Sequence, residues 1–95
     1  MKFARTQQFN DDFNKLEESD KIAVRNAFND VVSALEGDAG LRHHHRIKKM
    51  WGTQDIWEGH VKQNLCFTFH FANNPEGEKV CFFRRIGTHN IYNKP

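Results

Sequence analysis

The N-terminal third of the chain places apolar residues at helical spacing. Phe9, Phe13 and Leu16 fall on one side of a helix, which predicts a short amphipathic helix over about 8–17. The residues at 2–6 precede this pattern and are short and mixed in character. We therefore expect an edge strand before the first helix.

A second and longer helix is predicted after Ser19, because serine favours the N-cap position. Its apolar positions form one continuous stripe, made of Ile22, Val24, Ala27, Phe28, Val31, Ala34 and Leu35. Gly37 and Gly40 follow the stripe and should end the helix. The two helices then form a helical hairpin.

From Arg46 the period becomes strand-like, and β-branched and aromatic residues dominate as far as Ile86. The predicted strands lie at about 46–50, 54–62, 64–72 and 79–86. Their connections are short, so neighbouring strands should pair antiparallel and the helical hairpin should cover one face of the sheet. The expected fold class is α+β, with an N-terminal strand and a helical hairpin packed on one face of a twisted antiparallel β-sheet, in a single domain over 1–95.

The other face of the sheet should stay partly open, and a ligand could lie there. Alternation in 64–72 points one set of side chains to the core, namely Leu65, Phe67, Phe69 and Phe71, and turns Cys66, Thr68 and His70 to the other side. A three-residue loop at 62–64 places His60 opposite Cys66, whereas a two-residue loop places it opposite Phe67 and mixes the faces. We predict the three-residue loop.

In that register Glu58 and His60 project from the open face, and the preceding strand brings Lys48 and Lys49 close to them. The last hairpin decides which arginine joins them. One pairing brings Arg85 opposite Cys66, and a shift of one residue would present Arg84 instead. Two consecutive phenylalanines in this strand leave both registers open.

Composition limits the class of protein. The 95 residues are 38% hydrophobic and include nine Phe and two Trp, which indicates one core built from large rings. Two cysteines, Cys66 and Cys81, are too few for a zinc site or a disulfide framework, so both are expected to be free. No apolar run approaches the roughly 20 residues needed to span a bilayer, so we expect a cytoplasmic protein without a membrane partner.

Charge is unevenly distributed along the chain. Residues 10–38 hold eight acids against three bases, while residues 39–95 hold nine bases against four acids. A basic face suits a polyanion such as RNA, although a solvated face without a partner explains the same distribution. The run His43-His44-His45 cannot converge on one ion as spaced ligands do. We interpret it as a polar loop and assign no metal or other cofactor.

Two segments resemble a known family. The run Arg46-Ile47-Lys48-Lys49-Met50-Trp51-Gly52-Thr53-Gln54-Asp55-Ile56-Trp57-Glu58 is similar to the pattern I-K-K-L-x-G-T-x-D-I-W-E of RelE/ParE-type toxins. The run Phe83-Arg84-Arg85-Ile86-Gly87-Thr88-His89 is similar to the terminal L-R-R-V-G-T-H of that family. The element order also matches, so the resemblance covers the whole chain. It implies the toxin of a type II toxin–antitoxin system, covered by a cognate antitoxin.

The resemblance further implies an endoribonuclease that cleaves mRNA, on the ribosome or free of it. Metal-free cleavage needs a base for the 2′-hydroxyl proton, an acid for the leaving 5′-oxygen, and cations for the charged phosphorane. Glu58 is the expected base, and His89, held in a turn after the last strand, is the expected acid. The expected charge stabilisers are Lys48, Lys49, His60 and Arg85, and further RNA contacts are expected from Arg46, Arg84 and Tyr92.

One departure from the family is Leu65-Cys66, where relatives commonly have a tyrosine–arginine pair. Losing that arginine would cost on the order of 10²-fold in rate unless Arg85 replaces it. Two alternatives therefore stay open: a ParE-like toxin that inhibits gyrase without nuclease chemistry, and a degenerate member that only binds its antitoxin or RNA. Trp51 and Trp57 are expected in the core or at the antitoxin, and the oligomeric state stays open.

Overall fold

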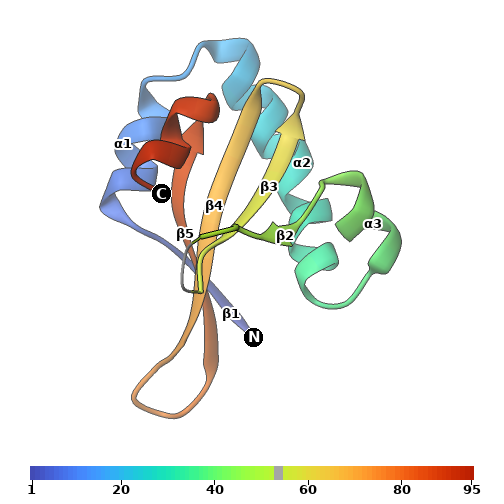
Figure 1. The fold of residues 1–95 in the computed structure, drawn as a ribbon, viewed down its shortest axis with the longest axis vertical. Coiled ribbons are helices and arrows are strands. Elements are labelled where there is room, and N and C mark those ends of the chain that lie inside the picture. Colours follow the sequence, from blue (N-terminus) through green and yellow to red (C-terminus); the bar gives the residue numbers. More distant parts are fainter. Residues whose placement is uncertain (53–54) are drawn as a thin grey trace.

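The computed structural model describes residues 1–52 and 55–95, so Thr53 and Gln54, the second of which begins the predicted strand 54–62, lie outside the described residues. The elements are β1 (Lys2–Arg5), α1 (Gln7–Asn14), α2 (Glu18–Leu35), α3 (Ala39–His44), β2 (Lys48–Lys49), β3 (Trp57–Lys62), β4 (Leu65–Asn73), β5 (Lys79–Gly87) and the short 3-10 helix η1 (His89–Asn93). In the described part of the chain, five strands form one sheet in the order β1-β5-β4-β3-β2 (Figure 1).

The sheet carries its helices on one face, as the sequence predicted. In Figure 1, α2 runs behind the strands, and its buried Val24, Val31 and Leu35 belong to the main core cluster. The β4 residues Phe67 and Phe69, both fully buried, belong to the same cluster. The predicted α+β class is confirmed. The edge strand β1 is also confirmed, but it pairs parallel to β5, whereas the other strand pairs are antiparallel.

The ends of α2 differ from the prediction. Glu17, and not Ser19, is the N-cap, and Glu18 and Asp20 lie in the first turn, where the helix dipole stabilises acidic side chains. Gly37 follows the helix with φ 124°, a conformation that disfavours any residue with a Cβ. Gly37 therefore ends α2 as predicted, whereas Gly40 lies within α3.

The helix α3 was not predicted. Its N-cap is Asp38, whose carboxylate accepts a hydrogen bond from the amide of Leu41 at 3.1 Å. The predicted polar loop His43-His44-His45 is wrong, because His43 and His44 form the last turn of α3 and His45 is its C-cap. His45 is also buried, at 3% exposed.

The β3–β4 pairing is confirmed, with His60 opposite Cys66. The predicted loop is nevertheless wrong, because β3 continues to Lys62 and the turn contains only two residues, 63–64. An irregularity in β3 between His60 and Lys62 supplies the extra residue and keeps the faces aligned. Within the same strand a Cβ at Gly59 would overlap the ring of Phe67, so close packing there requires glycine.

The β4–β5 pairing contradicts the register predicted for Arg85. Arg85 lies opposite Thr68, and Gly87 lies opposite Cys66. Two one-residue shifts cause the difference. Lys79 pairs with Asn73, whereas the predicted register requires it to pair with Ala72, and a bulge in β5 at Arg84 adds one further residue to that strand, which simple alternation cannot reveal. Neither arginine therefore comes to lie opposite Cys66.

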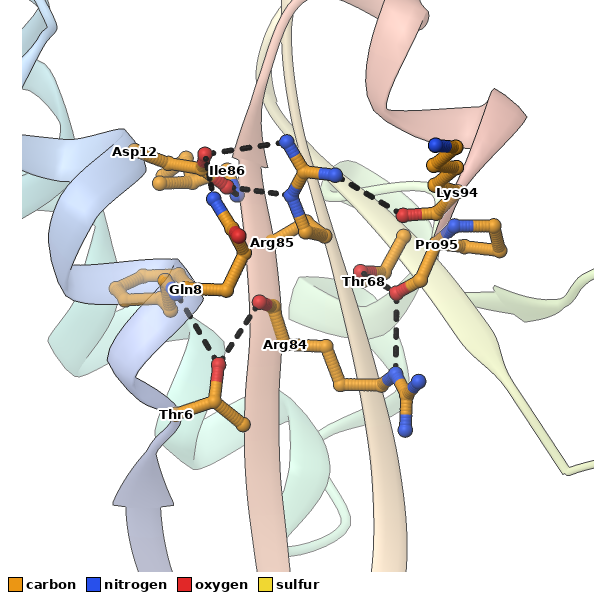
Figure 2. Close-up of polar contacts among 10 residues, drawn as sticks. Thr6, Gln8, Asp12, Thr68, Arg84, Arg85, Ile86, Lys94 and Pro95 are labelled. Atoms are coloured by element: carbon orange, nitrogen blue, oxygen red, sulfur yellow. Dashed lines mark hydrogen bonds and ion pairs between the residues drawn. The ribbon is translucent and has the colours of Figure 1, made fainter.

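Both arginines instead hold the last residues of the chain (Figure 2). The Nε of Arg84 donates to the main-chain oxygen of Pro95 at 3.0 Å, and the Thr68 hydroxyl donates to the same oxygen at 3.1 Å. Arg85 donates to the main-chain oxygen of Lys94 at 3.1 Å, and also to the carboxylate of Asp12 on α1. We call these residues the C-terminal clasp: Asp12, Thr68, Arg84, Arg85, Lys94 and Pro95.

The C-terminal segment also covers part of the face predicted to be open. Figure 1 shows this red segment in front of the sheet, and η1 contacts both β4 and β5. Cys66 and Thr68 are consequently fully buried, although they point away from the helical layer. The part of this face that the C-terminal segment leaves uncovered lies along β2 and β3.

Cys66 and Cys81 are free thiols, as predicted. Trp57 packs on Phe69 with ring centroids 6.2 Å apart, whereas Trp51 is 98% exposed and is not a core residue. Within residues 1–52 and 55–95, the helices are all too short or too polar to cross a membrane.

Candidate functional site

A cleft of about 710 Å³ opens between α3, the β2–β3 edge of the sheet and η1. Its lining residues are Ala39, Arg42, His43, Arg46, Ile47, Lys48, Glu58, His60, His89 and Tyr92. Glu58 and His89, the expected base and acid, thus share one cleft with His60, an expected charge stabiliser. Of the expected RNA contacts, Arg46, Lys48 and Tyr92 line it as well.

Glu58 projects into the cleft from β3. Its side chain is only 13% exposed and accepts a hydrogen bond of 3.4 Å from the Tyr92 hydroxyl. Lys48 lies directly opposite on β2, with its Nζ 4.0 Å from Oε1 of Glu58. Burial raises the pKa of Tyr92 far above its ordinary range. The hydroxyl therefore stays protonated and can donate a hydrogen bond to the carboxylate.

His60 lies two residues further along β3, on the same side. Burial, and then the positive charge of Arg46, lower the pKa of His60 below its ordinary value of 6.5, with smaller lowering effects from His89 and Lys48. The carboxylate of Glu58 acts in the opposite direction but does not outweigh them. The imidazole is therefore mostly uncharged at neutral pH.

His89 enters from the other side, at the start of η1. Thr88 is the N-cap of this short helix and accepts a hydrogen bond from the Asn90 amide at 3.4 Å. The ring of His89 lies 5.8 Å from that of His60 and 5.6 Å from that of Tyr92, measured between centroids. Two histidines from segments far apart in the sequence therefore face each other across the cleft.

The wall formed by α3 was missed by the sequence analysis, and with it Arg42 and His43. This wall is fixed to β3 by two hydrogen bonds: the His60 amide donates to the His45 carbonyl at 2.7 Å, and Nδ1 of His45 bonds the His60 carbonyl at 2.9 Å. The available signal was Asp38, a good N-cap residue four positions before Arg42.

Three expected site residues do not line the cleft. Lys49 pairs with Trp57 on the opposite side of β2 and forms an ion pair of 3.7 Å with Asp55. Arg84 and Arg85 belong to the C-terminal clasp, and the carboxylate of Asp12 pairs with Arg85 Nε at 2.7 Å. The cations that line the cleft are instead Arg42, Arg46 and Lys48, all from α3, β2 and the segment between them.

The sequence matches no protein-family model and no curated protein. Among solved structures, it resembles the YoeB/ParE toxin from Agrobacterium tumefaciens, with 16% identity, a TM-score of 0.66, and coverage of 94% of this chain and 99% of that one. It resembles YafQ from E. coli strain BL21(DE3), with 13% identity, a TM-score of 0.67, and coverage of 95% and 94%.

A third similar structure is the E. coli DinJ-YafQ complex, with 12% identity, a TM-score of 0.63, and coverage of 93% of this chain and 92% of that one. These structures match over nearly their whole lengths. The chain therefore has the fold of the YoeB/ParE and YafQ toxins, which confirms the fold that the sequence resemblance implied.

Proposed function

We propose that the chain is the toxin of a type II toxin–antitoxin pair and an endoribonuclease that cleaves mRNA by acid–base catalysis. One observation carries this proposal: Glu58, His60 and His89 meet in a single cleft, from β3 and from the start of η1. The shared fold supports it. A ParE-like gyrase inhibitor would not need this acid–base set, so the nuclease is the better proposal.

Glu58 acts as the base and takes the proton of the 2′-hydroxyl, whose oxygen then attacks the adjacent phosphorus. His89 in its protonated form acts as the acid and gives its proton to the leaving 5′-oxygen. The products are a 2′,3′-cyclic phosphate and a free 5′-hydroxyl. The ion pair with Lys48 and the hydrogen bond from Tyr92 hold the Glu58 carboxylate in place within the cleft.

His60 was expected to stabilise charge as a cation, and we assign it a different role. An uncharged imidazole cannot serve as a cation, but its N–H can donate a hydrogen bond to the 2′-oxygen and so orient the hydroxyl toward Glu58. Arg42, Arg46 and Lys48 line the same cleft and stabilise the charged phosphorane, in place of the arginine that relatives carry where this chain has Cys66. Arg85 is engaged with Asp12 and has no part in this mechanism.

The expected partners are a cognate antitoxin and mRNA, with the ribosome positioning the message. The DinJ-YafQ complex is a similar chain bound to another protein, and we propose an equivalent partner here. Trp51, which follows β2 in the sequence and is 98% exposed, is a candidate contact for it. The chain is expected to act in the cytoplasm.

Induced expression in cells tests the proposed function. We expect growth arrest together with new 5′ ends in messenger RNA. Arrest without new ends would contradict the nuclease and favour the gyrase-type alternative. Neither arrest nor new ends would indicate a chain that only binds its antitoxin or RNA. Because the ribosome can position the message, cells are the right setting for this test.

Lys48 and Lys49 offer a matched pair for testing the cleft. They are adjacent in β2, and only Lys48 lines the cleft. We expect Lys48→Ala to slow RNA cleavage about 10-fold, less than a buried donor would contribute because this side chain is 69% exposed. Lys49→Ala should leave cleavage unchanged. Equal effects of the two substitutions, measured as the rate at which cut messages accumulate, would argue against this cleft as the site.

A further inference from the structure

Three potential metal ligands converge on the floor of the cleft. His60, Cys66 and His89 each offer a ligand atom, and these atoms all lie within 4.8 Å of one another. They come from three separate elements, β3, β4 and η1. Spaced ligands from different elements can surround one ion, unlike the consecutive histidines at 43–45.

Two of the three ligands are held by the sheet. His60 and Cys66 lie directly opposite each other on neighbouring strands, so their Cβ atoms are about 4.5–5.5 Å apart. Cys66 is fully buried, whereas His60 and His89 line the cleft. An ion held by all three would therefore have protein on its sulfur side and the cleft on the other.

We propose that His60, Cys66 and His89 form a binding site for a zinc-type transition-metal ion, with a fourth coordination position open to the cleft. Two imidazoles and one thiolate are a ligand set suited to Zn²⁺ and Co²⁺. Bond lengths of about 2.0–2.3 Å in a tetrahedron put neighbouring ligand atoms roughly 3.3–3.6 Å apart. The ligand atoms must therefore approach by about 1 Å, and His89, which is exposed, has room to move.

His60 and Cys66 can each supply a ligand atom to this site. The buried Nδ1 of His60 has no hydrogen-bond partner among the described residues. Metal binding must displace the proton of the Cys66 thiol, and that proton leaves to solvent.

Metal at this site would engage His60 and His89, two of the residues to which the proposed function assigns a role in cleavage. If the proposed function holds, a bound ion and RNA would therefore exclude each other. The metal would be an inhibitor of cleavage and not its cofactor. This consequence rests on the proposed function, but the metal site itself does not.

Titration of the purified, untagged chain with Co²⁺ tests the site. We expect a thiolate-to-cobalt charge-transfer band in the near ultraviolet that saturates at one ion per chain, with one proton released. The band requires a thiolate, so the histidines at 43–45 cannot produce it. Cys66→Ala should remove the band. Cys81→Ala is the matched control, because Cys81 is equally buried on the neighbouring strand and should leave the band intact.

A second variant guards against misfolding of Cys66→Ala. His89→Ala alters an exposed side chain and should weaken Co²⁺ binding by at least about 100-fold. Replacing a residue that only orients a metal ligand already weakens metal binding by up to about that factor. The proposal is overturned if the wild-type chain gives no charge-transfer band, or if the band survives Cys66→Ala.

Added Zn²⁺ should suppress RNA cleavage by the wild type and not by Cys66→Ala. If the wild-type chain gave the cobalt band but did not cleave RNA in the absence of Zn²⁺, the proposed function alone would be overturned. The two failures are therefore distinguishable.

Discussion

RNA cleavage is expected to fall by about 10²–10⁴-fold when His89 is replaced by alanine, the contribution of one positioned general acid. Growth arrest on expression should disappear with it. Glu58→Gln should have a similar effect, because the amide keeps the shape of the side chain but cannot accept the 2′-hydroxyl proton. The measurement is growth after induction combined with mapping of the 5′ ends of messenger RNA.

His44→Ala is the control for His89→Ala. His44 is also an exposed histidine, in the last turn of α3, but it does not line the cleft. This variant should still arrest growth and cut messages at the same positions. If Glu58→Gln and His89→Ala each left cleavage intact, the assigned roles of acid and base would be wrong.

The second large effect is expected on stability. Asp12→Ala should lower the free energy of unfolding by about 3 kcal/mol, because it removes one partner of a largely buried ion pair. The Asp12 carboxylate accepts hydrogen bonds from Arg85 Nε at 2.7 Å, from the Ile86 amide at 3.2 Å and from Gln8 at 3.0 Å. Urea denaturation measures the change.

Asp11→Ala is the matched control for this effect. Asp11 is the preceding residue of α1, is exposed, and accepts one hydrogen bond from Gln7 within the same helix. Surface substitutions of this kind usually change stability by no more than about 0.5 kcal/mol. Equal losses in the two variants would mean that Asp12 contributes only to helix α1 and not to the clasp.

Asp12 should also make stability depend on pH. Burial alone would raise the pKa of Asp12, but hydrogen bonds from Arg85, Gln8 and Ile86, together with the Arg85 charge, lower it below its ordinary value of 3.8. A carboxyl whose folded pKa is depressed contributes its stability above the unfolded pKa and loses it as the pH falls through the folded pKa. The wild type should therefore lose stability below about pH 4 more steeply than Asp12→Ala, which urea midpoints across that range would show.

Most of the sheet could be predicted because its residues alternate clearly. In β4 every second residue from Leu65 to Phe71 is a large apolar side chain, and this pattern fixed the face of Cys66 and the partner of His60. In β5 two neighbouring phenylalanines and a bulge at Arg84 break the alternation. A bulge depends on tertiary packing, and alternation alone cannot locate it.

Clear alternation also allowed part of the candidate site to be predicted. Glu58 and His60 follow from strand alternation, and His89 from the turn after β5. Arg42 and His43 lie on α3, a six-residue helix with Leu41 as its one large apolar residue, so it shows no periodicity. Its position comes from the hydrogen bonds between His45 and His60, which join residues fifteen positions apart.

The C-terminal clasp joins three parts of the molecule that are distant in sequence. Arg85 bonds α1 through Asp12 and the chain end through Lys94, and His89 and Tyr92 lie on the segment between β5 and that end. Loosening of α1 should therefore free the segment that carries His89. In amide hydrogen exchange, α1, the end of β5 and η1 should open as one cooperative unit, separately from α3.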